Sequence, residues 1–450
     1  MNDTSSKVGS DPDLVSATKK VFKHVIPLFL IMYVLNYIDR VNIGFVKTHL
    51  ETDLGIGAAA YGIGAGMFFI GYCVFEVPAN MLLQRLGARI WLTRILFSWG
   101  LVATLMAFIQ SETHFYILRF LLGVSEAGFF PGVILYLSQW LPANERGRAV
   151  VIFMSGSAIA SIIAGPVSGA LLRIEGWGLH GWQWMFMIEG SASVFLAFFM
   201  WNWLKSKPED AEWMSDAERA ALYRSLDHEQ LERGAGKHGH TSAFKLLKDP
   251  KIAMFCLVYF VIQMTIYAVT FWLPSMIKAM GVSNDLQVGF FNSIPWIMAV
   301  IGMYLIAVGA KRWKHQHLWV ALSLLIAAAG LFAATFSGPV YAFVALCFAA
   351  IGFKAAASSF WPIPQGYLDR RIAAAVIGLI SAIGNLGGFV APVTFGLIEQ
   401  NTGSVSGGLM GLAIIALIGA GVTLALRVRS SNETPAIEVI PAHSALEKSR

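Results

Sequence analysis

The chain has 450 residues, of which 56% are hydrophobic and only 13% are charged, and its mean hydropathy is +0.62. Soluble globular proteins carry about 25% charged residues, so this composition excludes a soluble domain and predicts an integral membrane protein. The three cysteines (Cys73, Cys256 and Cys347) all lie in apolar segments, which excludes a disulfide framework and a cysteine-based metal site.

Apolar segments of about 20 residues or more follow one another along the chain. A helix of about 20 residues crosses the roughly 30 Å of hydrocarbon in a bilayer, so each segment predicts one spanning helix. We therefore expect an all-α membrane protein with twelve transmembrane helices. The predicted spans are 25–45, 60–83, 91–109, 115–139, 149–172, 184–204, 252–275, 288–309, 317–336, 340–363, 373–397 and 408–427.

Basic residues predict how the helices are oriented. If both termini are cytoplasmic, 27 of the 33 Lys and Arg residues fall on the cytoplasmic side, and the outer loops carry only Lys47, Arg173 and Lys278. The polar segment 1–24 is too long for the start of a signal peptide, and no cleavage site follows the first span, so we expect that helix to be retained. The net charge of +6 reflects this bias and does not support nucleic-acid binding. The expected location is the cell (inner) membrane, with cytoplasmic tails 1–24 and 429–450.

One long polar stretch, residues 205–251, interrupts the spans and predicts a cytoplasmic linker between two six-helix halves, 25–204 and 252–428. Transporters built from repeated halves have this organisation, with a central cavity between the halves. Within the linker, GAGKHGHT lacks the first Gly and the final Ser or Thr of a phosphate-binding loop, so we expect no nucleotide-driven pumping. No cofactor is expected, and the proton gradient is the expected source of energy.

Charged residues inside the predicted spans point to a functional site. Asp39, Arg40, Arg119 and Glu126 lie in or at the ends of otherwise apolar helices. A charge at the bilayer centre costs about 2.5–3.5 kcal/mol, so such residues usually face a bundle interior or a water-filled path. Static ion pairs between helices are the alternative.

Arg119 and Glu126 are seven residues apart, which places them about 10 Å apart on one helical face. That distance is too long for an ion pair but suits two groups that line a cavity. A nearby Arg favours the ionised form of a buried carboxylate, and a solute anion bound to the Arg removes that effect. All ten histidines lie in loops or tails, so the carboxylates are expected to carry the proton.

The tenth predicted span contains Lys354, followed by Ser358 and Trp361 at spacings that place all three on one helical face. We interpret Lys354 as a second positive charge at the cavity. The alternatives are an ion pair with a buried acid such as Glu126, or a side chain that reaches cytoplasmic water. In the seventh span, every fourth residue is polar or aromatic, which is consistent with a packing stripe or with solute contact: Tyr259, Gln263 and Tyr267.

Small residues recur at corresponding positions of the fifth and eleventh spans. The fifth reads GSAIASIIAGPVSG (156–169) and the eleventh GNLGGFVAPVTFG (384–396). Small residues let helices approach closely in lipid, and an interior proline permits a kink. Static packing explains the pattern equally well, but its repetition in both halves favours helices that pack across a moving interface.

Five segments carry a resemblance to a known family: NYIDRVNIGF (36–45), EVPANMLLQRLGAR (76–89), RFLLGVSEAGFFPG (119–132), GWQWMFMIEG (181–190) and ISAIGNLGGFVAP (380–392). They resemble the major facilitator superfamily, and more narrowly its anion:cation symporter group, over about residues 20 to 428. This resemblance implies a carrier of organic anions such as galactonate, tartrate, phthalate or 4-hydroxyphenylacetate.

The resemblance also implies roles for individual residues. Asp39 and Glu126 match proton-carrying carboxylates, and Arg119 matches the basic residue coupled to the acidic one. The loop after the second span has Gln84 where the family has Asp, while its two arginines remain. The positions expected to line the solute site are Tyr37, Arg40, Tyr72, Arg119, Ser157, Lys354, Ser358, Trp361 and Asn385. Among them, Lys354 is included only because of its place in the tenth span, and Ser157 stands where sugar-acid carriers have Gln. The basic residues expected to act in gating are Arg85, Arg89, Arg146 and Arg148.

The sequence as a whole predicts a proton-coupled secondary transporter that imports a small organic carboxylate, phthalate-like or tartrate-like, by alternating access. A sugar-acid symporter and an organic-anion exchanger without proton coupling are the alternatives. An enzyme is not expected, because HExxH, GxSxG and paired histidines within a span are absent from the sequence. The expected partners are the organic anion, protons and membrane lipid, and the protein is expected to be a monomer.

Overall fold

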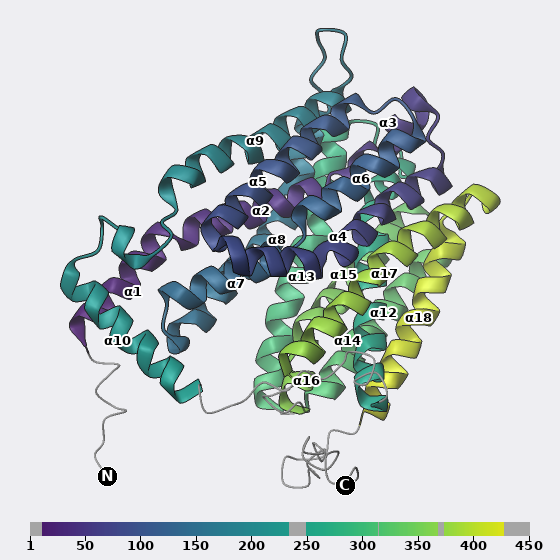
Figure 1. The fold of residues 1–450 in the computed structure, drawn as a ribbon. Coiled ribbons are helices and arrows are strands. Elements are labelled where there is room, and N and C mark those ends of the chain that lie inside the picture. The colour runs from purple at the N-terminus through teal and green to yellow at the C-terminus, as the bar shows by residue number, and fades with distance from the viewer. Residues whose placement is uncertain (1–10, 234–248, 314, 368–372, 427–450) are drawn as a thin grey trace, which may run out of the picture.

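The computed structural model describes residues 11–233, 249–313, 315–367 and 373–426, and nearly all of them are helical (Figure 1). The segment GAGKHGHT and the predicted tail 429–450 lie outside the described residues. The helices are α1 (Pro12–His24), α2 (Ile26–Val41), α3 (Ile43–Leu54), α4 (Ala58–Leu86), α5 (Ala88–Leu105), α6 (Glu112–Glu126), α7 (Phe129–Trp140), α8 (Ala143–Leu171), α9 (Gly181–Trp203), α10 (Asp216–Arg233), α12 (Pro250–Ala279), α13 (Asp285–Arg312), α14 (Gln316–Phe336), α15 (Pro339–Phe360), α16 (Pro362–Tyr367), α17 (Ala373–Thr402) and α18 (Ser406–Ala425).

Within these residues, twelve helical segments are long and apolar enough to cross a membrane, which confirms the predicted number. Three of them combine consecutive α-helices, as in Glu112–Trp140, which contains α6 and α7. The break between those two helices falls at Gly128, whose φ of 83° is left-handed. A Cβ there would lie 3.0 Å from both Ala79 Cβ and Trp91 Nε1, so the backbone conformation and the close packing both favour glycine.

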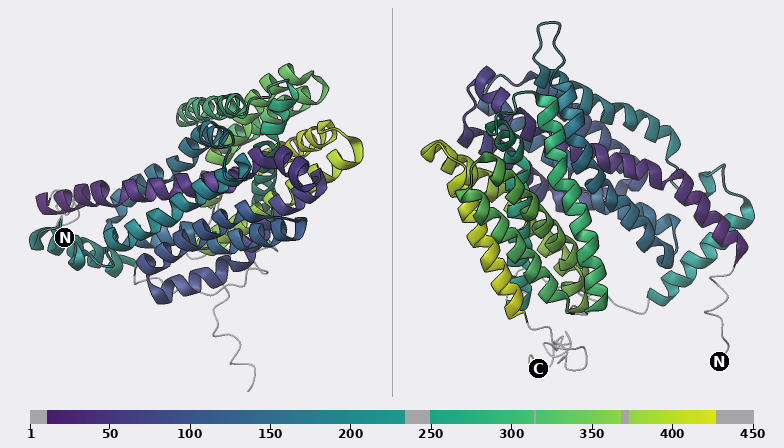
Figure 2. Two further views of the ribbon diagram at one scale, coloured as in Figure 1. Left: turned by 90° about the horizontal axis from the view of Figure 1, so that it is seen from above. Right: turned by 180° about the vertical axis from the view of Figure 1, so that it is seen from behind.

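The helices form two groups, α1–α10 and α12–α18, which lie side by side (Figures 1 and 2). The groups contact each other through α4 with α17, α8 with α13, and α3 with α12. Both described ends of the chain lie at the same end of the molecule, where the two groups diverge.

Glycines form close backbone contacts between the groups. A Cβ added to Gly165 of α8 would lie 2.2 Å from the carbonyl oxygen of Gly289 in α13, and one added to Gly289 would lie 2.1 Å from that of Gly165. A Cβ on Gly62 of α4 would lie 2.2 Å from the carbonyl oxygen of Pro392 in α17. The small-residue segments of the fifth and eleventh spans therefore do face the other group, at backbone-to-backbone distance.

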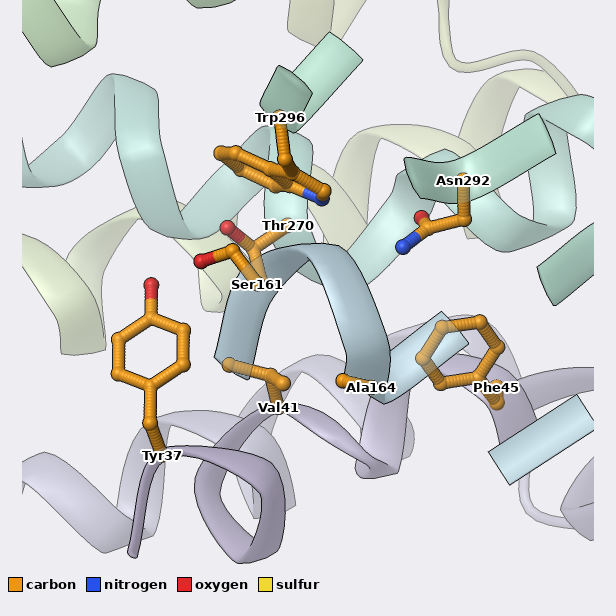
Figure 3. Close-up of a pocket in the computed structure, with 8 residues that line it drawn as sticks. All are labelled: Tyr37, Val41, Phe45, Ser161, Ala164, Thr270, Asn292 and Trp296. Carbon is orange, nitrogen blue, oxygen red and sulfur yellow. The ribbon is translucent and has the colours of Figure 1, made fainter. Parts of the chain in front are cut away.

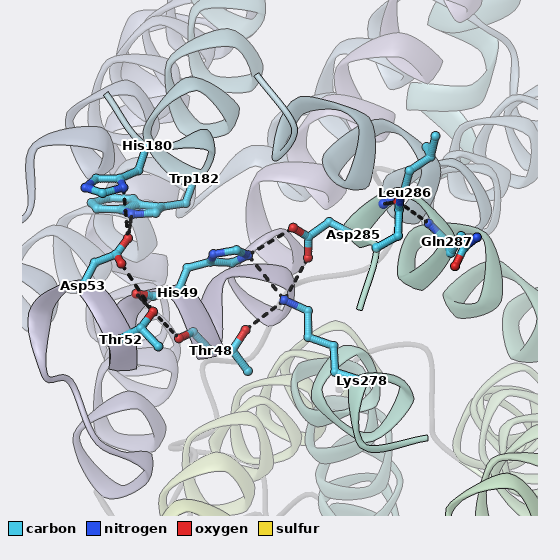
Figure 4. Close-up of polar contacts among 11 residues, drawn as sticks. Thr48, His49, Thr52, Asp53, His180, Trp182, Lys278, Asp285, Leu286 and Gln287 are labelled. Carbon is cyan, nitrogen blue, oxygen red and sulfur yellow. Dashed lines mark hydrogen bonds and ion pairs between the residues drawn. The ribbon is translucent and has the colours of Figure 1, made fainter. Parts of the chain in front are cut away.

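Polar side chains join the groups at the end remote from the termini, which we call the distal end (Figure 4). The buried Lys47 of α3 forms an ion pair with Glu399 of α17, with 2.7 Å between Nζ and Oε1. Lys278 of α12 donates across the groups to the hydroxyl of Thr48 on α3 at 2.9 Å, and within its own group it forms an ion pair with Asp285 of α13 at 2.8 Å. These contacts hold the groups together at the distal end.

At the opposite end, α10 packs against α1 through Glu218, a buried carboxylate. Burial alone would raise the pKa of Glu218, but hydrogen bonds from Lys20 Nζ at 2.8 Å, Ser16 Oγ at 2.6 Å and the N–H of Ser215 at 2.7 Å lower it to about 2. The contact therefore depends on an ionised Glu218.

Candidate functional site

Arg40, in the last turn of α2, is the centre of the candidate site. Its Nη2 lies 2.7 Å from Glu126 Oε2 on α6 and 3.3 Å from Asn36 Oδ1, one turn earlier on α2. Its Nη1 lies 3.5 Å from the hydroxyl of Tyr267 on α12. The Glu126 side chain is fully buried, whereas that of Arg40 is 16% exposed. One guanidinium thus contacts both helix groups and keeps some access to solvent.

Aromatic rings surround the two arginines. The ring of Phe68 lies 5.0 Å from the guanidinium carbon of Arg40 and 5.3 Å from that of Arg119, and the ring of Tyr72 lies 5.7 Å from Arg40. Arg119 is 1% exposed and donates to the carbonyl oxygen of Ala65 at 3.3 Å. Cation–π contacts of this kind stabilise guanidinium groups away from water. Arg119 does not pair directly with Glu126, as their spacing predicted.

Glu126 and Asp39 each have one hydrogen-bonded oxygen and one without a partner. In Glu126 the free atom is Oε1. In Asp39 it is Oδ1, whereas Oδ2 accepts from Trp99 Nε1 and from Ser193 Oγ, both at 3.0 Å. Burying an unpaired carboxylate oxygen is costly, so both groups are suited to taking up a proton.

Asp39 lies on a different face of α2 from Arg40. Consecutive helical residues are about 100° apart, and this turns Asp39 toward α5 and α9. Asp39 thus faces the interior of the first helix group, whereas Arg40 and Glu126 pair with each other on the side of the second group. Nearby, both oxygens of Glu189 are hydrogen bonded, to Asn42 and Ser168, each at 2.8 Å.

Lys354 of α15 faces α2. Its Nζ lies 3.4 Å from the Tyr37 hydroxyl, 5.5 Å from the centre of the Tyr37 ring and 5.1 Å from that of Trp296 on α13. Lys354 forms no ion pair with Glu126, so that alternative is wrong. In the described part of the chain its ammonium has no carboxylate partner.

The three residues of the four-residue repeat in α12, Tyr259, Gln263 and Tyr267, each contact a candidate residue. Gln263 donates to Asn385 Oδ1 at 3.3 Å, and the ring of Tyr259 lies 4.8 Å from that of Trp361. With the contact between Tyr267 and Arg40, the four-residue repeat of α12 follows the candidate site along its length. Ser157 is half-buried; it donates to Met154 and also forms a hydrogen bond with the side chain of Tyr33 on α2. Ser358 is exposed and donates to Ala355.

A small cavity of about 10 Å³ lies between α2, α3, α8, α12 and α13, as Figure 3 shows. Tyr37, Val41 and Phe45 recur every fourth residue, and this spacing places them on the wall formed by α2 and α3. The other lining residues are Ser161, Ala164, Thr270, Asn292 and Trp296.

The arginines predicted to act in gating contact only residues of the first helix group and the linker, in the part of the chain that the structure describes. Arg89 donates to the carbonyl oxygen of Trp201 at 2.7 Å, and Arg146 pairs with Glu229 at 3.1 Å. Arg148 lies over the ring of Phe22, and Arg85 is exposed. The polar contacts described across the two groups lie instead at the distal end and at the candidate site.

Sequence reasoning missed Asn36, Phe68, Asn292 and Trp296. Asn36 carries a signal, since it precedes Arg40 by one turn of the helix. The other three are neutral residues in apolar spans, where hydropathy gives no indication of a site.

Comparison with known proteins identifies the family of the chain. Residues 29–392 match the model of the Major Facilitator Superfamily. A protein of Agrobacterium vitis named "Putative tartrate transporter" is 42% identical over 92% of this chain and 91% of its own length. A "Quinolone resistance transporter" of Acinetobacter baumannii is 40% identical over 88% and 91%. The fold resembles the crystal structure of a bacterial homologue of the human lysosomal transporter Spinster in an inward-facing, occupied conformation. The TM-score is 0.73 at 17% sequence identity, and the match covers 90% of this chain and 96% of the other.

These relatives are transporters and not enzymes, and they match this chain over nearly its whole length. The chain therefore belongs to the Major Facilitator Superfamily and is a multi-pass membrane transporter.

Proposed function

We propose that the protein is a proton-coupled secondary transporter that imports a small organic carboxylate across the cell membrane by alternating access. The observation that carries the proposal is the ion pair of Arg40 with Glu126, in which a fully buried carboxylate shares a partly exposed guanidinium with Tyr267 of the other helix group. The two six-helix halves, 25–204 and 252–428, would move as units, with both termini in the cytoplasm.

The coupling follows from competition for one guanidinium. Arg40 offers a planar donor fork that suits a substrate carboxylate. When the substrate takes those donors, Glu126 loses its counter-charge in a buried environment, and this favours its protonated form. Asp39, which also has an unpaired oxygen, is proposed as a second protonation site behind α2. Substrate anion and proton would thus stabilise each other on the carrier.

Asn385 and Gln263 are proposed to complete the carboxylate contact from the second half, and Tyr72, Trp361, Ser358 and Ser157 are proposed as further substrate contacts. The name of the Agrobacterium vitis relative supports a carboxylate as the substrate. No cofactor is needed, because the proton gradient supplies the energy, and a monomer contains the whole site.

The test is uptake of radiolabelled tartrate into proteoliposomes with an acidic exterior, with and without a protonophore. Wild type should accumulate tartrate and lose this ability with the protonophore. Glu126→Gln should fail to accumulate tartrate yet still exchange internal for external substrate, because exchange requires no net proton release. Accumulation that survives in Glu126→Gln would remove Glu126 from the coupling mechanism.

Glu189→Gln is the matched control, since Glu189 is equally buried but has both oxygens hydrogen bonded. It should accumulate tartrate like wild type. Two alternatives are distinguished by the same assay. Uptake insensitive to the pH gradient in wild type would favour an anion exchanger, and uptake of galactonate in preference to tartrate would favour a sugar-acid symporter.

A further inference from the structure

We infer that Lys354, Asn292 and Trp296 form a second substrate subsite, one that recognises a carboxylate and an adjacent hydroxyl at the end of the substrate remote from Arg40. The inference rests on the proposed function and specifies its substrate class: a short dicarboxylate that carries a hydroxyl group.

Asn292 supplies the first reason. Its side chain is 4% exposed, it lines the small cavity, and among the described residues its amide has no hydrogen-bond partner. Figure 3 shows the amide directed toward the middle of the lining residues. Buried primary amides are nearly always hydrogen bonded, so this one is available to a ligand. An amide both donates and accepts, and this matches the requirements of a hydroxyl group.

The size of the cavity decides which group it takes. A volume of about 10 Å³ has room for one water-sized group. A hydroxyl fits, whereas an aromatic ring does not. The cavity therefore favours a substrate that places a hydroxyl group next to Asn292.

Lys354 supplies the charge. Its ammonium has three donors, and the Tyr37 hydroxyl at 3.4 Å uses only one of them. A cation without a counter-charge inside a membrane span is costly, so an anionic group of the substrate would stabilise it. Tyr37 and Trp296 contact Lys354 and also line the cavity, so the ammonium and the Asn292 pocket share two walls.

The spacing relative to Arg40 suits a short substrate. Tyr37 and Arg40 are three residues apart on α2, which corresponds to about 4.5 Å along the helix axis. Because Lys354 contacts Tyr37, the two cations lie near the same face of α2 about one turn apart, which favours a short diacid over a long one. The first carboxylate would bind Arg40, and the second would bind Lys354 with its neighbouring hydroxyl on Asn292.

The experiment compares three ligands: tartrate, succinate (a diacid without hydroxyls) and glycerate (a hydroxy monoacid). Affinities are measured by competition against labelled tartrate exchange in wild type, Asn292→Leu and Lys354→Met. Asn292→Leu should weaken tartrate at least tenfold and change succinate less than twofold. Lys354→Met should weaken both diacids at least tenfold and leave glycerate within twofold.

Three controls keep the result interpretable. Lys354→Arg retains the charge and should recover most of the diacid affinity. Thr423→Val changes a buried residue of α18 outside the site and should leave all three affinities unaltered. If a variant fails to fold, the wild-type panel decides alone, because the subsite requires tartrate to bind at least tenfold more tightly than succinate and glycerate.

Equal binding of the three ligands by wild type, or a uniform loss of all three in both variants, would overturn the subsite. Neither result affects the proton-coupling test with Glu126→Gln. Conversely, failure of wild type to transport any carboxylate would overturn the proposed function itself.

Discussion

Replacing Lys47 with methionine should weaken closure of the distal end. Lys47 is 4% exposed, and its Nζ lies 2.7 Å from Glu399 Oε1, on the other helix group. Hydrogen bonds to charged groups contribute about 1.5–3 kcal/mol. Glu399 is 21% exposed and keeps the bond from Trp272 Nε1 at 2.6 Å, so water compensates in part and the lower end of that range applies. A loss of about 1.5 kcal/mol raises the ratio of open to closed molecules about tenfold.

Pulsed electron paramagnetic resonance can measure this ratio. Spin labels at Glu51→Cys and Asn401→Cys, both exposed at the distal end, report the distance between the groups in a background without the three native cysteines. The Lys47→Met variant should gain a longer-distance population, and Lys47→Arg should resemble wild type. An unchanged distance distribution in Lys47→Met would show that this ion pair does not contribute to closure.

Three further predictions concern packing and protonation. Gly165→Ala should force α8 and α13 apart and lower the melting temperature. Gly147→Ala is the control, because nothing lies within 4 Å of the added Cβ, and it should leave the melting temperature unchanged. Equal melting temperatures of the two variants would contradict the close crossing. Asp39→Leu leaves the buried Trp99 Nε1–H without its acceptor and should lower the free energy of unfolding by about 1–3 kcal/mol. Asp39→Asn retains an acceptor and should leave the free energy of unfolding unchanged. Chemical denaturation of the two variants would measure the difference. The pKa of Glu218 in the folded state, about 2, lies below the ordinary value of 4.5. The stabilisation from Glu218 should therefore be complete above about pH 4.5 and lost as the pH falls toward 2. Hydrogen exchange of α10, corrected for intrinsic rates, would detect this loss.

For the last of these, Glu218→Gln should remove the pH dependence of exchange in α10. Glu212→Gln is the control, since Glu212 is 92% exposed and forms only a 3.9 Å pair with Lys205. A pH profile of α10 that does not change in Glu218→Gln would assign the effect to another group.

The sequence predicts the twelve spans because the bilayer imposes one simple requirement, a sufficiently long apolar helix, that can be counted along the chain. It also identifies Arg40, Glu126 and Lys354, because a charge in such a helix is conspicuous. It does not show that Asp39 and Arg40 face different neighbours, since adjacent residues of a helix point in different directions and only tertiary packing decides what each one meets. Asn292 gives no signal at all, because a neutral amide hardly alters hydropathy.

Contacts between distant segments are the other part that the sequence leaves open. The small residues around Gly165 and Gly396 predict close helix packing, but not that their partners are Gly289 and Ala58. That pairing depends on how the two groups dock, which is a property of the whole fold. The distal-end contacts of Lys47 and Lys278 have the same origin: both residues are visible as outer-loop cations, but their partners are brought together only by docking.

The glycine crossings bear on how quickly the transporter can change conformation. At Gly165 and Gly289 each helix presents a bare Cα to the carbonyl oxygen of the other, so no side chains interlock there. Helices that interlock through large side chains must change rotamers or separate before they can rotate, and both processes add to the activation barrier. A smooth contact between backbones avoids this step. The slow step of the conformational cycle should therefore be the rupture of polar bonds at the distal end, and turnover should respond more strongly to mutations in those bonds than to changes in the lipid-facing side chains around the crossings.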